Sequence, residues 1–245
     1  MKPIIKPGWP APIGVMACTT LRTGGYSQAP WSSWNLADHV GDDPDHVRQN
    51  RRNLTESLRL PDEPVWLKQV HGIGVITIDG DKPAMNSVAD GSYTRVPGKV
   101  CVVQTADCLP VLITSRQGTE VAAIHAGWRG LANGVLESGL KKFRCAADDL
   151  TVWLGPAIGP ERFEVGEEVK AAFMKKDPMA GKAFKKTTEN KYQADLYQLA
   201  RQRLKLSGVS RVYGGGYCTH SDQERFFSYR RDGQTGRMAS LIWIE

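Results

Sequence analysis

The chain has 245 residues, a formal net charge of +6, 41% hydrophobic and 24% charged residues, which are the proportions of an ordinary globular protein. Its apolar runs are too short for a membrane span, and its N-terminus has no signal-peptide core, so we expect a soluble, cytoplasmic protein. The five cysteines are an odd number without a Cys-x-x-Cys pair, which argues against a disulfide framework and against a zinc finger.

The positive charge lies in short clusters that mostly fall on the polar faces of predicted helices, as is typical of a solvated surface. The sequence has no aromatic-interleaved basic stripe of the kind that binds single-stranded nucleic acid. We therefore expect a monomer that binds neither nucleic acid nor membranes. Its charge is compatible with a small anionic substrate.

In chain order, the first predicted element is a strand over residues 13–20, which ends in the turn Arg22-Thr23-Gly24-Gly25. A helix is predicted to begin near Asp43-Pro44 and to run towards Pro61, because an acid and a proline are favoured in the first helical turn. Residues 65–70 and 74–78 are predicted to form a strand pair around His71-Gly72. Short runs rich in valine and isoleucine predict buried strands over 100–105, 111–114 and 121–125.

After residue 125 the apolar spacing becomes helical, with one face formed by Leu131, Val135, Leu136, Leu140 and Phe143. The later predicted elements are a strand over 151–154, helices over 167–176 and 195–206, and strands over 211–213 and 238–244. Residues 177–190 are polar and lysine-rich and are predicted to form a loop. Strands and helices do not alternate steadily and no long linker occurs. We therefore expect one mixed α/β (α+β) domain over residues 1–245 with mixed sheets, and not a Rossmann-like fold.

The most informative candidate for a functional residue is Cys108, which lies between two distant histidines, His71 and His125. Each of the three stands at the end of an apolar stretch and beside Gly, Pro or Asp, where a strand would stop and its last side chain would face a cleft. One thiol and two imidazoles suit a borderline divalent metal, above all zinc. Three protein ligands leave a fourth position open, as in catalytic zinc sites.

Other interpretations of the same residues stay open. Cys108 and His125 also suit a nucleophile and its general base, and a free cysteine is often simply buried. Charges at Asp107 and Arg129, where a core strand would be apolar, favour a functional interpretation. With Cys218 or His220 as a fourth ligand the zinc would be structural, as in a non-enzymatic sensor.

Four further segments contain residues that a core does not need, and each has a plain structural alternative. Arg22, beside its glycine pair, could clamp an anion or belong to a simple turn. Residues 155–160 could aim backbone N–H groups at a ligand or merely connect two elements. The arginines of residues 226–233 could stack on a base and hold a phosphate, or lie in a hairpin. Residues 34–39 could line a pocket or form a loop.

Several of these motifs occur together in one order along the chain: Arg22-Thr23-Gly24-Gly25, Asn35-Leu36, Gly41-Asp42-Asp43, Asn50-Arg51, Gln69-Val70-His71-Gly72, Thr105-Ala106-Asp107-Cys108-Leu109-Pro110, His125-Ala126-Gly127-Trp128-Arg129-Gly130, Leu154-Gly155-Pro156-Ala157-Ile158-Gly159 and Phe227-Ser228-Tyr229-Arg230-Arg231-Asp232. This set resembles the YfiH-type laccase-domain (polyphenol oxidase) family, which is now grouped as purine nucleoside phosphorylases and peptidoglycan editing factors. The resemblance covers essentially the whole chain, and its motifs are highly specific.

The resemblance implies a single-domain, layered α/β/β/α sandwich similar to the catalytic domain of a cytotoxic deamidase toxin. It also implies a metal site formed by His71, Cys108 and His125, usually with zinc and with copper possible. The implied activity is phosphorolysis of adenosine, inosine, guanosine and methylthioadenosine, with adenosine deamination beside it. Copper-dependent oxidation of phenols, and a Cys–His hydrolase that edits peptidoglycan precursors, are the alternatives.

Simple chemistry ranks these activities. A multicopper oxidase needs several copper centres, for which five histidines are too few. Phosphorolysis needs groups that hold an anion and that protonate or tether the leaving purine. We predict Cys108, His125, Asp107 and Arg129 as catalytic residues, with Asp107 as an acid–base partner. We predict Arg22, Gln69 and Arg230 as substrate- or phosphate-binding residues, and Arg22 and Arg129 as the phosphate clamp.

Overall fold

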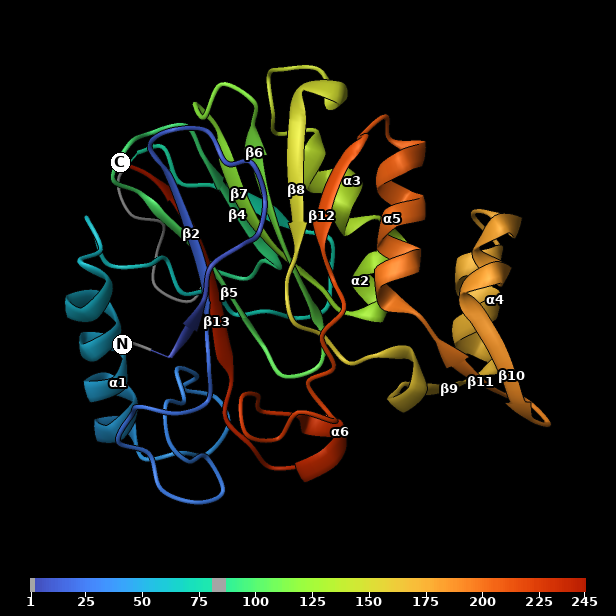
Figure 1. Cartoon of the computed structure of the whole chain (residues 1–245), viewed down its shortest axis with the longest axis horizontal. Helices are drawn as coiled ribbons and strands as arrows, with labels where there is room; N and C mark the ends of the chain where they lie inside the picture. Colours follow the sequence, from blue (N-terminus) through green and yellow to red (C-terminus); the bar gives the residue numbers. More distant parts are fainter. Residues whose placement is uncertain (1–2, 81–86) are drawn as a thin grey trace.

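Two large β-sheets stack face to face at the centre of the molecule (Figure 1). The computed structural model describes residues 3–80 and 87–245. The four-stranded sheet has the order β1 (Ile4–Ile5), β2 (Val15–Thr20), β13 (Met238–Ile244) and β5 (Val100–Thr105). The six-stranded sheet has the order β12 (Arg211–Gly214), β8 (Leu150–Leu154), β6 (Leu109–Ser115), β7 (Val121–Ala126), β4 (Gly91–Thr94) and β3 (Val75–Thr77).

The central strands are buried on both faces, because each sheet has the other sheet on one side and helices on the other. In β6, Leu112 packs between the two sheets, whereas its neighbours Val111 and Ile113 pack towards the helices. Successive side chains of a strand point to opposite faces, so a strand covered on both sides is apolar throughout. This explains why the central strands are continuous apolar runs in the sequence.

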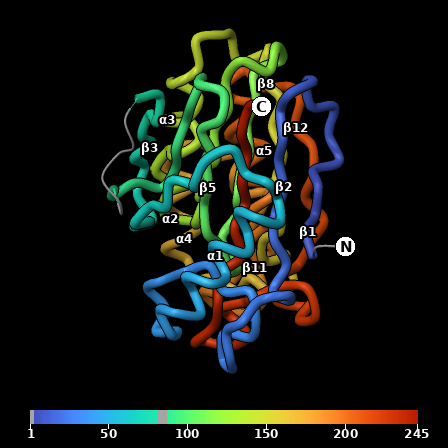
Figure 2. Tube along the Cα trace, turned by 90° about the vertical axis from the view of Figure 1, so that its left-hand side faces the viewer, coloured from blue at the N-terminus to red at the C-terminus, as the bar shows by residue number. Residues whose placement is uncertain are grey.

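Helices cover the outer faces of the two sheets. Helix α1 (Pro44–Leu58) covers the four-stranded sheet, where Leu54 belongs to the same buried cluster as Val102 and Trp243. Figure 2, viewed from the α1 side, shows this helix in front of the sheet that contains β2 and β5. The six-stranded sheet is covered by α2 (Trp128–Asn133), α3 (Val135–Leu140) and α5 (Leu196–Leu206).

A small third sheet lies beyond α5 and forms the end of the molecule farthest from α1 (Figure 1). It has the order β10 (Phe184–Thr188), β11 (Lys191–Ala194) and β9 (Glu164–Gly166), and it is accompanied by α4 (Glu167–Met174). The remaining helical segments are the 3-10 turns Ala147–Asp149, Pro160–Arg162 and Pro178–Ala183 and the short helix α6 (Tyr229–Asp232). No helix in the described part of the chain is both long and apolar enough to cross a membrane.

The mixed α+β architecture predicted from the sequence is confirmed. Strands β5 and β13 have the predicted bounds. Helix α1 begins at Pro44, with the Asp43 side chain accepting a hydrogen bond from the Asp45 N–H as an N-cap. Among the described residues, the strands of the four-stranded sheet pair antiparallel, and in the six-stranded sheet β12–β8 and β3–β4 are the parallel pairs, so the expectation against a Rossmann-like fold also holds.

Three local predictions are wrong. Residues 65–70 form no strand: apart from single hydrogen bonds such as that from the Val65 N–H to the Val100 carbonyl, they make an isolated bridge between Lys68 and Val88, and β3 pairs with β4 instead. The predicted helix after residue 125 is two helices, because Gly134 adopts a left-handed conformation with φ 107° between them. Residues 177–190, predicted as a loop, contain a 3-10 turn and strand β10, whose polar side chains face solvent at an edge.

Candidate metal centre

Cys108 lies where the chain crosses from one large sheet to the other. Strand β5 ends at Thr105 in the four-stranded sheet, and β6 begins at Leu109 in the six-stranded sheet, so the short connection places Cys108 at the end of the sheet interface. In the pairing of β6 with β7, Leu109 is opposite Ala126 and Pro110 is opposite His125. The start of β6 therefore lies beside the end of β7, which brings Cys108 next to His125.

His71 reaches the same point from the loop before β3. Its backbone adopts a left-handed conformation with φ 59°. The buried carboxylate of Asp90 holds this loop by accepting the backbone N–H of His71 at 2.8 Å and of Gly72 at 2.6 Å. The same carboxylate lies 2.8 Å from Nδ1 of His125, and the Asp90 carbonyl accepts the His125 N–H. One residue therefore positions both histidines.

The three side chains converge on a point where a metal ion could be bound. One potential ligand atom of each of His71, Cys108 and His125 lies within 4.8 Å of the others, and Cys108 Sγ is 3.7 Å from His71 Nε2. Tetrahedral zinc, with Zn–S and Zn–N bonds of about 2.3 and 2.0 Å, holds its sulfur and nitrogen ligands about 3.6 Å apart. With Nδ1 of His125 facing Asp90, Nε2 is left for a metal, the arrangement found in carboxylate–histidine–zinc sites.

Gly127 lies directly beside the point where the three side chains converge. A Cβ atom at this position would lie 2.7 Å from Cδ2 of His71 and 3.2 Å from Sγ of Cys108. The backbone of Gly127 has φ −65°, so the requirement for glycine comes from space and not from backbone conformation. The His125-Ala126-Gly127 motif therefore supplies one ligand and the room for two others.

The electrostatics of the site favour a thiolate. Burial opposes ionisation of Cys108, but the charge of His125 and hydrogen bonds from both histidines outweigh it and lower the pKa of the thiol. Burial likewise disfavours a charged His125, but Cys108 and Asp90 raise its pKa above the usual value. The thiolate is the form that binds a metal and that acts as a nucleophile.

Comparison with known proteins places this site in a family. Residues 16–245 match the family described as multi-copper polyphenol oxidoreductase laccase. The chain belongs to this family. It is 54% identical over 244 residues to the purine nucleoside phosphorylase YfiH of Escherichia coli, with 100% of both chains covered. It is 52% identical to a purine nucleoside phosphorylase of Pseudomonas aeruginosa, with 98% of both chains covered.

Solved structures of family proteins have the same fold. A Neisseria meningitidis protein described as DUF152 superposes with a TM-score of 0.96, at 45% identity and with 100% of both chains covered. YlmD from Geobacillus stearothermophilus superposes with a TM-score of 0.93, at 31% identity, covering 100% of this chain and 97% of that one. The resemblance to the YfiH-type laccase-domain family inferred from the motifs is therefore confirmed.

Asp107, predicted as an acid–base partner, is bound on both carboxylate oxygens. Oδ1 accepts the Thr219 hydroxyl at 2.6 Å, and Oδ2 accepts the backbone N–H of Arg230 at 2.7 Å. Its backbone is left-handed, with φ 93°, and its carbonyl accepts the Ile158 N–H. These bonds support a role in which Asp107 fixes the turn that carries Cys108, in addition to any acid–base role.

The predicted substrate-binding residues differ in how many of their side-chain donors and acceptors are already hydrogen-bonded within the protein. All three guanidinium nitrogens of Arg22 donate to backbone carbonyls, those of Ser32 and Gln223. The amide of Gln69 is paired with the backbone of Gln104 in both directions. Arg230 donates through Nη1 to the Glu164 carbonyl. Arg129 is exposed, in the first turn of α2, and stacks on Trp128 with its Cζ 4.5 Å from the ring centroid.

The other segments singled out in the sequence have structural roles in the family fold. The N–H groups of residues 155–160 that could meet a ligand are used inside the protein, for example by the Pro110 carbonyl and the Tyr197 hydroxyl, so this segment is a connection. Residues 229–232, where a hairpin was one interpretation, form α6. Cys218 and His220 do not belong to the cluster of metal-binding side chains found among the described residues.

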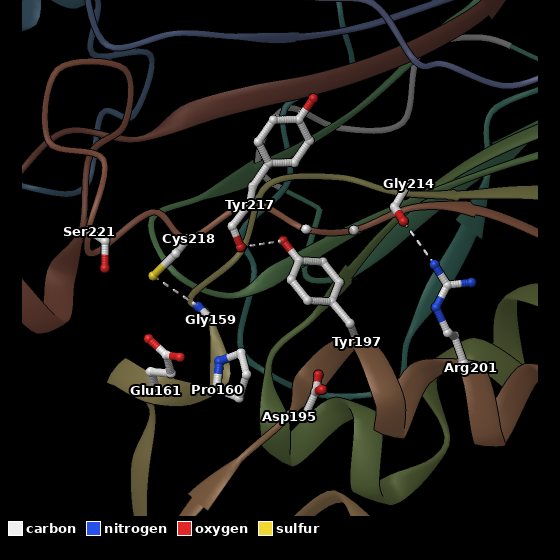
Figure 3. A pocket seen from close by; sticks show the side chains of 12 residues that line it. Gly159, Pro160, Glu161, Asp195, Tyr197, Arg201, Gly214, Tyr217, Cys218 and Ser221 are labelled. Carbon is white, nitrogen blue, oxygen red and sulfur yellow. Dashed lines mark hydrogen bonds between the residues drawn. The ribbon is translucent and has the colours of Figure 1, made fainter.

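A cavity of about 400 Å³ borders this connection at Gly159 and Pro160, and none of His71, Cys108 and His125 lines it (Figure 3). Figure 3 shows the Cys218 thiol at its edge, bound to the N–H of Gly159 at 3.2 Å. Among its polar residues, Arg201 donates to the carbonyls of Val212 and Gly214, Asp195 accepts the Gln198 N–H, and Tyr197 is bonded to backbone groups. The polar groups of this cavity are therefore largely occupied by the protein itself.

Two residues of the metal centre were missed from the sequence. Asp90 stands before β4, a strand that was not predicted because Gly91-Ser92-Tyr93-Thr94 has no apolar alternation. An acid directly before a short strand is a weak signal. Gly127 lay inside a motif that was recognised, but only the position of its absent Cβ shows why glycine is required.

Proposed function

We propose that this protein is a zinc-dependent purine nucleoside phosphorylase. The observation that carries the proposal is the full-length similarity to relatives named as purine nucleoside phosphorylases, at 54% and 52% identity. The open three-residue site of His71, Cys108 and His125 supports it, because three protein ligands leave room for a further ligand. We propose adenosine, inosine, guanosine and methylthioadenosine as substrates.

In the proposed reaction a phosphate oxygen attacks C1′ of the ribose while the C1′–N9 bond breaks. The electron pair of that bond moves to the purine, which takes up a proton, and the products are a free purine and ribose 1-phosphate. The protein must hold the phosphate dianion beside C1′ and assist protonation of the base. We propose Cys108, His125, Asp107 and Arg129 for catalysis, and Arg22, Gln69 and Arg230 for substrate binding.

The residues present fit zinc. A sulfur and two imidazole nitrogens form a donor set that zinc prefers, and the missing Cβ of Gly127 leaves space between them. Bound zinc would lower the pKa of a bound water to about 7, which suits deamination of adenosine as a side activity. The role of Asp90 is to hold the His125 ring with Nε2 turned towards the centre.

Activity and metal content test this proposal together. Zinc-loaded protein incubated with adenosine and phosphate should release adenine and ribose 1-phosphate, with some inosine. Cys108→Ala and His125→Ala should abolish turnover and leave the far-ultraviolet circular dichroism spectrum unchanged. Absence of turnover with all four nucleosides, where a control phosphorylase is active, would refute the proposal.

A thiol hydrolase is the second candidate, because Cys108, His125 and Asp90 form a Cys–His–Asp arrangement. The pKa of Cys108 is lowered by His125 despite burial, and His125 is held by the Asp90 carboxylate, as in nucleophile–base–acid triads. Its substrate would be an amide of a peptidoglycan precursor, in keeping with the proposed likeness to a deamidase toxin. Activity that survives full removal of metal but not alkylation of Cys108 would favour this candidate.

Phenol oxidation by several copper ions is less well supported, despite the family description. The chain has five histidines, and His71 and His125 are the two that join the metal-binding cluster among the described residues. A multicopper oxidase needs both an electron-entry copper and a trinuclear cluster, which together require many more imidazole ligands. A single copper ion in place of zinc remains compatible with the donor set.

A further inference from the structure

Two cavities share a wall at His39 and lie near the loop that carries His71. One cavity, of about 510 Å³, is lined by Gln69, which precedes His71 by two residues, and by His39. A second cavity, of about 420 Å³, is lined by His39, Tyr229, Thr235 and Arg237. Because His39 lines both, the cavities adjoin, and Gln69 connects the first of them to the loop that carries His71.

Arg237 brings a positive charge to the second of these cavities, close to Cys108. It directly precedes β13, whose first residue Met238 pairs with Thr105, and Thr105 is three residues before Cys108. Burial lowers the pKa of the Arg237 guanidinium, and the negative charges of Cys108 and Asp107 oppose this effect. The Arg237 guanidinium is therefore close enough to Cys108 for the charges of the two groups to interact.

The Arg237 side chain is fixed on one side and free on the other. Nη1 donates to the carbonyls of Thr235 and Gly236, at 2.8 and 3.0 Å, and the guanidinium lies over the Tyr229 ring with Cζ 5.8 Å from its centroid. Within residues 3–80 and 87–245, no acceptor is recorded for Nε or Nη2 of Arg237. Two donor nitrogens of a preorganised guanidinium are thus free to bind a ligand bidentately.

A second polar group without a partner is close by. Thr235 is 1% exposed, and in the described structure its hydroxyl has no hydrogen-bond partner. A buried hydroxyl without a hydrogen-bond partner is destabilising, so it gains from a ligand that can bind to it. Thr235 and Arg237 line the same cavity.

Arg237 differs in this respect from Arg22, one of the arginines chosen from the sequence. Arg22 uses Nε, Nη1 and Nη2 on backbone carbonyls, so its binding of an anion would require breaking those bonds. Arg230 points Nη1 to the Glu164 carbonyl and stacks on Phe163. Arg230 also keeps two guanidinium nitrogens without a recorded acceptor among the described residues, but its side chain is exposed, whereas Arg237 is half-buried and lines the cavity together with Thr235.

We infer that Arg237, with the Thr235 hydroxyl, forms the subsite that binds the inorganic phosphate co-substrate beside the metal centre. This inference rests on the proposed phosphorolysis and names the residues that would hold its second substrate. A phosphate dianion matches the charge and the bidentate geometry of a guanidinium, and a threonine hydroxyl adds a further donor. The adjoining cavities leave room for the nucleoside between Arg237 and the wall formed by His39 and Gln69.

The test measures phosphate binding and turnover separately, with zinc-loaded protein. Arg237→Gln removes the charge, Arg237→Lys keeps the charge but loses the bidentate geometry of the guanidinium, and Thr235→Val removes only the hydroxyl. Arg52→Gln, an exposed arginine of α1, is the matched control for loss of one positive charge. Binding is read from the rise in melting temperature with increasing inorganic phosphate, and in parallel with adenosine 5′-monophosphate.

We expect wild-type protein and Arg52→Gln to be stabilised by phosphate equally. Arg237→Gln should need about tenfold to a hundredfold more phosphate for the same rise, the loss expected for one or two charge-assisted hydrogen bonds. Its KM for phosphate should rise by a similar factor, while the KM for adenosine and the zinc content stay near wild type. Arg237→Lys should recover part of the loss, and Thr235→Val should give a smaller increase.

The inference and the proposed function fail in different ways. Stabilisation by phosphate that depends on Arg237, without any phosphorolysis, would support the subsite and refute the function. Phosphorolysis with an unchanged KM for phosphate in Arg237→Gln would refute the subsite and support the function. Wild-type protein that is not stabilised by phosphate, or that is stabilised only by the nucleotide, would overturn the subsite.

Discussion

Oδ1 of Asp90 lies 2.8 Å from Nδ1 of His125, and both side chains are buried, at 0% and 3% exposure. The pair links β4 to β7 across the six-stranded sheet, because the Asp90 carbonyl also accepts the His125 N–H. The Asp90 carboxylate also accepts hydrogen bonds from the backbone N–H groups of His71 and Gly72 and so holds the His71 loop. The geometry of the metal centre therefore depends on a residue that does not itself belong to the ligand cluster.

Replacing Asp90 by Asn should weaken metal binding. The amide offers one oxygen instead of two and places an N–H₂ group against N–H donors, so His125 and the His71 loop lose their common acceptor. Loss of such an outer partner typically costs about 10–100-fold in metal affinity. Zinc affinity measured by competition with a chromophoric chelator checks this.

Asp79→Asn is the matched control, because Asp79 is paired with Arg95. It should leave zinc affinity unchanged. Equal zinc affinities for Asp90→Asn and wild type would show that Asp90 does not position the ligands.

Replacing Gly127 by Ala should displace His71 and Cys108. The new Cβ would lie 2.7 Å from one and 3.2 Å from the other, so at least one ligand must move by several tenths of an ångström. We expect zinc content after dialysis to fall at least about tenfold, the lower end of the loss seen when a ligand is misplaced. Gly8→Ala, where a Cβ would meet no atom within 4 Å, is the control and should keep full zinc content.

The reactivity of Cys108 in metal-free protein should depend on pH as expected for a thiol with a lowered pKa. Burial acts against the thiolate, but His125 and His71 lower the pKa of Cys108 to about 6, against a usual value of 9.0. The thiolate is the reactive form, so alkylation should be near its maximum above about pH 7 and should decline as the pH falls through about 6.

Rates of carboxamidomethylation at each cysteine, measured by peptide mass spectrometry, test this dependence. Cys101 is an internal control, because burial raises the pKa of its thiol to about 12 and the residue is fully buried. Added zinc should protect Cys108. An alkylation rate for Cys108 that is still rising steeply above pH 8 would contradict the prediction.

Replacing Asp107 by Ala should reduce both stability and activity. The change removes acceptors for the Thr219 hydroxyl and the Arg230 N–H. It also places at φ 93° an alanine, whose side chain can form no hydrogen bond that would stabilise this backbone conformation. Hydrogen bonds to a charged group contribute about 1.5–3 kcal/mol each, so the loss of two should lower the free energy of unfolding by about 3–6 kcal/mol.

Urea denaturation measures that loss, with Asp148→Ala, an exposed aspartate, as the control. Asp107→Asn should be milder, since asparagine tolerates the left-handed region. Activity lost in Asp107→Asn at full stability would instead favour the acid–base role.

Strongly periodic and continuously apolar segments were predictable because their pattern depends on neighbours in the chain. Strands β5 and β13 are continuous apolar runs, and α1 has a proline and an acid in its first turn. Strand β4 and the hairpin of β10 and β11 were not predictable, because their residues are largely polar and lack an apolar alternation; β4 is held by pairing with β7, and β11 by pairing with β9. Residues 65–70 have a strand-like pattern, but only Lys68 makes a bridge.

For the candidate metal centre, residue type and motif pointed to His71, Cys108 and His125, and the structure brings one potential ligand atom of each within 4.8 Å of the others. That these side chains bind a metal stays a prediction. The sequence could not show that Asp90 binds both histidines, that Gly127 makes room for the ligands, or that Arg22 is occupied whereas Arg237 is free. These properties depend on which donors and acceptors meet across 35 to more than 100 residues of chain, and only the packing of the two sheets decides which of them remain for a ligand.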